Sequence, residues 1–89
     1  MKIYDFDGRK NISGERIREA RLKRRLSQAD LAAKAQIEGI TLERDSISRI
    51  EIGTRFVADY ELMTFSKILG VDVKWLLSED DTWPPVQEK

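Results

Sequence analysis

The pattern that determines the architecture lies in residues 27–51, which read SQADLAAKAQIEGITLERDSISRIE. Ser27 stands three residues before Asp30, which is the spacing of a capping box at the first turn of a helix. Small and apolar residues follow at helical spacing, so another helix can approach this one closely. A connection over 37–43 comes next, and Gly39 is its turn residue. Its apolar side chains, which predict that the connection lies against the body of the protein, are Ile37, Ile40 and Leu42.

A second helical pattern occupies residues 44–52, RDSISRIEI, and Gly53 is of a type favoured just past a helix end. Ile47 and Ile50 are three residues apart, so both are predicted to face inward. The other side of this helix is polar, which is a poor composition for a helix that serves only as scaffold. A capped helix, a connection and a short helix with a polar outer face occur in the order of a helix-turn-helix.

Three further helices are predicted around this pair. The first is capped by Ser13 and extends from Gly14 to about Arg25. Another begins at residue 58 or 59 and ends at Gly70, and a short one over residues 73–77 is capped by Asp72. The aromatic side chains predicted to lie in the core are Tyr60, Phe65 and Trp75. We therefore expect an all-α fold of five short helices without strands.

The length and composition exclude several classes of function. The chain has 89 residues, the size of one small domain, which we divide into an arm (1–12), a helical domain (13–78) and a tail (79–89). It contains no cysteine and no histidine, so a Cys/His zinc site and a histidine-dependent catalytic triad are excluded. We expect no metal, no cofactor and no enzymatic activity. No apolar run reaches the length of a membrane span, so we expect a cytoplasmic protein without membrane contact.

The charge is balanced overall but unevenly distributed. Residues 9–25 hold eight basic and two acidic side chains, a net charge of +6, whereas residues 56–89 hold three basic and seven acidic, a net charge of −4. The basic segment indicates either a polyanionic partner or an ordinary solvated helix face. The side chains expected to form a general basic surface there are Arg16, Arg18, Lys23, Arg24 and Arg25.

The sequence resembles the Cro/lambda-repressor-like family, also called the XRE family, over about residues 17–77. Three blocks in order carry the resemblance: IREARLKRRLSQADLAAKA, SISRIEIGTR and LMTFSKILGVDVKWLL. The resemblance implies a five-helix lambda-repressor-like domain that binds double-stranded DNA, with the helix at 44–52 in the major groove. It also implies a transcriptional regulator, which we expect to act as a repressor and to bind as a homodimer.

The resemblance assigns DNA contacts to particular residues. Ser27 and Gln28 match a Ser/Thr-Gln pair at a helix N-terminus that meets either a phosphate or the edge of the DNA site. Arg49 has the chemistry to bind guanine, while Asp45 either accepts from cytosine, holds Arg44 or Arg49 in place, or caps the helix. The full set of expected DNA-binding residues is Ser27, Gln28, Arg44, Asp45, Ser46, Ser48, Arg49, Thr54 and Arg55.

Two other residues match a structural element of the family. Arg21 in the first helix and Glu51 at the end of the third correspond to a partly buried ion pair that fixes the angle between helices. We therefore do not expect Arg21 to contact DNA, despite its charge.

The sequence also departs from the family pattern. The connection before residue 44 is about five residues longer than the usual form, and it carries Glu38 and Glu43. Ala58 replaces the usual Ser/Thr cap, which leaves Asp59 as a candidate cap. The acidic connection favours an alternative function, a protein-interaction module of antitoxin-like or adaptor type in which DNA binding is secondary. An open positive face around Arg44 and Arg49 would favour DNA, whereas a face covered by Glu38, Glu43 and Asp45 would favour a protein partner.

Overall fold

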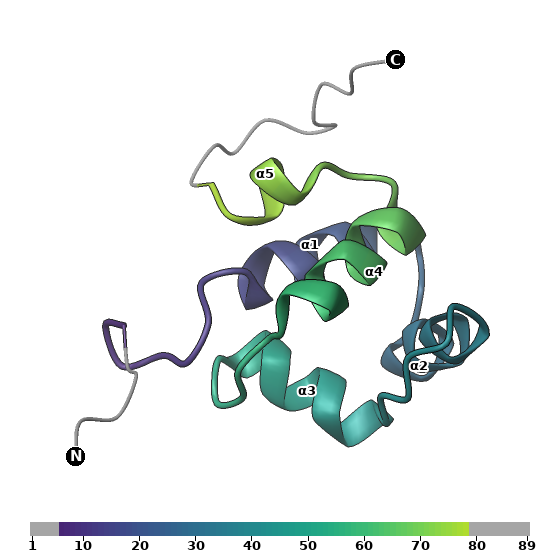
Figure 1. Cartoon of the computed structure of the whole chain (residues 1–89), viewed down its shortest axis with the longest axis horizontal. Helices are drawn as coiled ribbons and strands as arrows, with labels where there is room; N and C mark the ends of the chain where they lie inside the picture. The colour runs from purple at the N-terminus through teal and green to yellow at the C-terminus, as the bar shows by residue number, and fades with distance from the viewer. Residues whose placement is uncertain (1–5, 79–89) are drawn as a thin grey trace.

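The computed structural model describes residues 6–78, so the predictions for residues 1–5 of the arm and for the tail 79–89 lie outside the described part. Five α-helices follow one another in it, and they confirm the all-α fold (Figure 1). Residues 6–78 contain no strand, only one isolated antiparallel bridge between Phe6 and Arg9. The helices are α1 (Gly14–Lys23), α2 (Gln28–Ile37), α3 (Arg44–Ile52), α4 (Asp59–Leu69) and α5 (Val73–Leu76).

The helices pack around a central pair, α1 and α4. α1 and α4 contact each other, and each of them also contacts α5. α3 packs against α1 and α2. Figure 1 shows α3 and α5 on opposite sides of α1 and α4. The core side chains come from every helix, and most of them lie at the positions that the helical period predicts. The fully buried ones include Ile17, Leu31, Ile47, Ile50, Phe65, Leu69 and Leu76.

Two predictions of burial are wrong. Tyr60 is 59% exposed, because it lies on the outer side of the first turn of α4. Ile37 is 82% exposed, because α2 includes this residue as its last and turns its side chain away from the core. The other two apolar side chains of the connection do lie against the body, since Leu42 is buried and Ile40 packs on the core.

The helix ends follow local chemistry in most places. Ser27 and Asp30 form the predicted capping box, in which each side chain accepts a hydrogen bond from the other's backbone N–H, both at 2.9 Å. Gly53 and Gly70 end α3 and α4 in the left-handed region, with φ of +98° and +69°. Asp72 makes no side-chain cap on α5, contrary to prediction.

The start of α1 also differs from prediction. Ser13 is buried and makes no side-chain cap; instead, Asn11 Oδ1 accepts a hydrogen bond from the Gly14 N–H at 2.8 Å. The Asn11 amide nitrogen also donates to the Ile50 and Arg55 carbonyls, at 3.0 and 2.8 Å. A Cβ at Gly14 would lie 2.1 Å from the Ile50 oxygen, so only glycine allows this approach. Asn11 and Gly14 thereby bring the start of α1 against the end of α3.

None of the helices in residues 6–78 is both long enough and apolar enough to cross a membrane.

Candidate nucleic-acid interface

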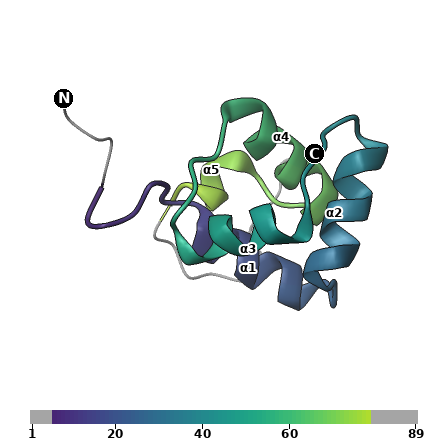
Figure 2. The ribbon, with the colours of Figure 1, turned by 90° about the horizontal axis from the view of Figure 1, so that it is seen from below.

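The outer face of α3 is polar and open to solvent. Ile47 and Ile50 are completely buried, which turns the opposite side of this nine-residue helix outward. Arg44, Asp45 and Arg49 are exposed, whereas Ser46 and Ser48 are half-buried at its edges. Figure 2 looks onto this side of the molecule and shows α3 between α1 and α4, with α2 next to its beginning.

Asp45 and Arg49 form an ion pair on this face. One guanidinium nitrogen of Arg49 lies 2.9 Å from Asp45 Oδ2, one helical turn away, and the two side chains are 61% and 72% exposed. Asp45 does not cap α3, since the N-cap residue is Glu43, whose side chain also makes no capping bond. In this structure Asp45 therefore orients Arg49, which is one of the roles expected for it.

The start of α2 borders the start of α3 at a shallow open concavity. Its volume is about 360 Å³, and its lining residues are Gln28, Glu43, Arg44, Asp45 and Ser48. Ser27 lies at the N-terminus of α2, and the N-terminus of a helix favours an anion. Hydrogen bonds from the Ser27 backbone N–H and hydroxyl lower the pKa of Asp30, so this carboxylate stays charged in the first turn.

A buried hydrogen-bonded group connects α1, α2 and α3 behind this surface. The Arg21 guanidinium donates to both oxygens of Glu51, at 2.7 and 3.0 Å, and both side chains are less than a tenth exposed. Arg21 also donates to the Leu26 carbonyl before α2. The Gln28 side-chain amide donates to Glu51 at 3.0 Å. Gln28, which we expect to contact DNA, is therefore also bonded to this buried ion pair.

Thr54 and Arg55 lie in the loop that follows α3. Thr54 is exposed and donates its backbone N–H to the Arg49 carbonyl at 2.9 Å. The Arg55 guanidinium binds both oxygens of Glu61 on α4, at 3.0 and 3.2 Å, while about a third of its side chain stays exposed. Burial raises the pKa of Glu61, but hydrogen bonds from Arg55 and the Ala58 N–H outweigh it, and the pKa lies below its ordinary value of 4.5.

The general basic surface predicted on α1 is only partly present. Arg16 is 8% exposed: it donates to the Ser78 carbonyl, pairs with Glu19 and lies 4.8 Å from the Trp75 ring centroid. Arg24 donates to the Leu69 carbonyl at the end of α4. The prediction that Arg16 is a general surface charge is therefore wrong, whereas Arg18, Lys23, Arg24 and Arg25 are exposed.

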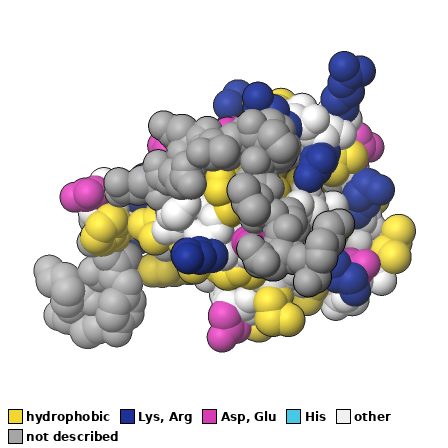
Figure 3. Space-filling view, turned by 90° about the horizontal axis from the view of Figure 1, so that it is seen from above, with side chains coloured by type: hydrophobic (Ala, Val, Ile, Leu, Met, Phe, Trp, Pro, Cys, Tyr) yellow, Lys and Arg dark blue, Asp and Glu magenta, His cyan; other side chains and the backbone are white. Residues whose placement is uncertain are grey.

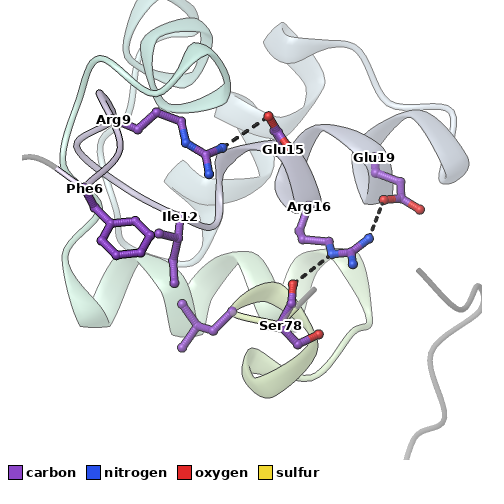
Figure 4. A pocket seen from close by; sticks show the side chains of 8 residues that line it. Phe6, Arg9, Ile12, Glu15, Arg16, Glu19 and Ser78 are labelled. Atoms are coloured by element: carbon purple, nitrogen blue, oxygen red, sulfur yellow. Dashed lines mark hydrogen bonds and ion pairs between the residues drawn. The ribbon is translucent and has the colours of Figure 1, made fainter. Parts of the chain in front are cut away.

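A second open concavity of about 450 Å³ lies between the arm, α1 and the end of α5 (Figure 4). Phe6 and Ile12 lie on its apolar side, and its cations Arg9 and Arg16 are paired with Glu15 and Glu19. On the α5 side of the molecule, the basic, acidic and hydrophobic side chains of the described residues are interspersed (Figure 3).

Of the two acidic residues of the long connection, Glu38 is held away from α3, whereas Glu43 lies at its beginning. Glu38 forms an ion pair with Lys67 of α4 at 2.8 Å, which holds it against a different helix from the expected DNA-contact residues. Glu43 is exposed at the beginning of α3, where it lines the concavity between α2 and α3 together with Arg44.

The packing of α2 and α3 and the polar outer face of α3 define a helix-turn-helix domain. The sequence matches no protein-family model and no curated protein. Among solved structures it is similar to the P22 c2 repressor protein, in a crystal structure with synthetic operator 9T in the presence of Tl+. The TM-score is 0.66 at 28% sequence identity, over 79% of this chain and 98% of the repressor chain. The chain is thus a lambda-repressor-like helix-turn-helix domain, which confirms the resemblance seen in the sequence.

Proposed function

We propose that this protein binds double-stranded DNA sequence-specifically and acts as a transcriptional repressor, with α3 in the major groove. The observation that carries the proposal is the outer face of α3, where Arg44 and Arg49 are exposed on a helix whose other side is completely buried. The similarity to a repressor whose structure contains an operator supports it. So does the Glu38–Lys67 pair, because it keeps one of the acidic side chains off this face.

The proposed contacts divide into base reading and positioning. The major groove is about 12 Å wide and admits an α-helix, and its guanine edge accepts two hydrogen bonds from one guanidinium group. Arg49 would bind guanine in this way, and Asp45 would orient the Arg49 guanidinium through their ion pair. The Asp45 carboxylate could also accept a hydrogen bond from the amino group of a neighbouring base. Ser27, Gln28, Thr54 and Arg55 would contact the DNA backbone on either side of α3 and set its register.

Repression would be steric. A domain bound over a promoter occupies the surface that RNA polymerase needs, so no separate effector site is required. One nine-residue helix reaches few base pairs, which supports binding as a homodimer on two half-sites related by a two-fold axis.

Selection from random DNA duplexes tests the proposal. The wild-type protein should enrich one motif, and Arg49→Ala should lose the preference at one position of each half-site while losing about 1–3 kcal/mol of binding free energy. Lys74→Ala is the control, since Lys74 is an exposed cation on α5, on the other side of the molecule from α3.

Two outcomes contradict this reading. If Arg49→Ala enriches the same motif as wild type, α3 does not read the bases through this residue. If the wild-type protein enriches no motif, the protein-interaction module becomes the better reading of the fold.

A further inference from the structure

The N-terminal arm is hydrogen-bonded to the end of α3 and to the loop that follows it. The Lys10 backbone N–H donates to the Gly53 carbonyl at 2.8 Å, directly after the last turn of α3. The next residue, Asn11, binds the Ile50 and Arg55 carbonyls through its side chain. Figures 1 and 2 show the arm leaving the molecule at the end where α3 runs into the loop before α4.

Further contacts fix the outer part of the arm. Phe6 and Arg9 exchange backbone hydrogen bonds of 2.7 and 2.9 Å, which close a turn. Arg9 pairs with Glu15 of α1 at 3.2 Å. The Arg9 side chain also packs closely on Gly53, because a Cβ added to that glycine would lie only 3.1 Å from it. The arm is therefore anchored to both α1 and α3, and its backbone positions the side chains that it carries.

Lys10 presents a cation at this edge. Its ammonium nitrogen lies 5.3 Å from the centroid of the Phe56 ring, and within residues 6–78 no carboxylate pairs with it. The two neighbouring cations, Arg9 and Arg55, are each bound to a glutamate. Among these three, Lys10 is the one whose charge no carboxylate in the described chain neutralises.

We propose that Lys10 binds a phosphate of the DNA backbone, beside the contacts of Thr54 and Arg55. This inference rests on the proposed function and extends that interface from the loop after α3 to the arm. A helix in the major groove lies between the two phosphate backbones that border the groove. Lys10 lies next to the loop after α3, and this loop would run beside one of the two backbones. An ammonium group serves a phosphate as a point charge, so it adds affinity and salt dependence but no base preference.

The test compares the motif-containing duplex and an unrelated duplex over a range of salt concentrations. Lys10→Gln removes the charge and keeps most of the chain that lies against Phe56, while Lys10→Arg keeps the charge. Lys74→Gln on α5 is the matched control for loss of one exposed lysine. Thermal unfolding of each variant confirms that it is folded at the temperature of the binding measurement.

We expect Lys10→Gln to bind both duplexes about 5- to 10-fold more weakly at 0.1 M salt, with a log–log salt slope that is smaller by about 0.9. Lys10→Arg and Lys74→Gln should keep the wild-type slope. An unchanged slope in folded Lys10→Gln overturns this inference alone, because the wild type still binds its motif. Failure of the wild type to bind any duplex overturns the proposed function and this inference together.

Discussion

Arg21 and Glu51 are opposite charges that folding removes almost completely from water. Glu51 accepts three hydrogen bonds, two from Arg21 and one from Gln28, and Arg21 donates a further one to the Leu26 carbonyl. Attraction at such close range offsets the desolvation of the pair only while both partners are present. The pair therefore acts mainly by fixing how α1, α2 and α3 meet, which sets the direction in which α3 is presented.

Arg21→Met is expected to lower the free energy of unfolding by about 3–5 kcal/mol, because it leaves the Glu51 carboxylate buried without its cation. The double variant Arg21→Met/Glu51→Leu should be more stable than this single variant, since no unpaired charge remains. Urea unfolding followed by circular dichroism measures both. Asp45→Ala breaks the exposed pair on α3 and should cost about 1 kcal/mol or less. A loss of that same small size in Arg21→Met would show that the pair is hydrated in solution.

At the scale of the elements, the beginning of α4 depends on one carboxylate. Ala58 has no side-chain acceptor, so the Glu61 carboxylate takes the Ala58 N–H and both Arg55 donors. Glu61 thus closes the first turn of α4 and ties it to the loop after α3. Its lowered pKa means that folding favours the charged form of this group.

Glu61→Gln is expected to destabilise the protein at pH 7 by about 1.5–3 kcal/mol, because hydrogen bonds to a charged group are lost. The folded-state pKa lies below the ordinary 4.5, so this stabilisation is complete above pH 4.5 and is lost as the pH falls through the lower folded-state value. Unfolding free energies of wild type and variant, measured from pH 7 to pH 3, should converge toward the acidic end. A constant difference across that range would contradict the assignment.

Local patterns predicted the elements well because their causes are local. Helical period and the Ser27–Asp30 box act within one or two turns, so α2, α3 and the inward side of α3 follow from the sequence. The role of Asn11 depends on carbonyls 39 and 44 residues away, and the burial of Arg16 depends on Trp75 and Ser78. No short-range pattern contains such partners, which is why the arm had no predicted place.

The candidate interface shows the same division. Exposure of Arg44 and Arg49 follows from the period of α3, since Ile47 and Ile50 occupy its buried side. The pairing of Asp45 with Arg49 is compatible with their four-residue spacing, but the sequence left it as one role among several. The contact between Gln28 and Glu51 requires the packing of α2 on α3, which only the folded chain provides.

At the scale of the whole molecule, the proposed homodimer makes a geometric prediction about its DNA. Two α3 helices related by a two-fold axis should read half-sites whose centres lie about 34–36 Å, or 10–10.5 base pairs, apart. The motif selected from random duplexes should therefore be an inverted repeat with that spacing. A protein that binds as independent single copies would instead select one half-site without a fixed partner.

Insertion of five base pairs between the half-sites tests the prediction, because it turns one half-site by about half a helical turn relative to the other. We expect the affinity to fall to that of an isolated half-site, since a rigid pair of α3 helices can then face only one groove. The same five base pairs added outside the site are the control for duplex length, and should leave binding unchanged. Equal affinity for the interrupted and intact sites, in a titration followed by gel shift, would mean that each copy binds alone and that specificity resides in a single half-site.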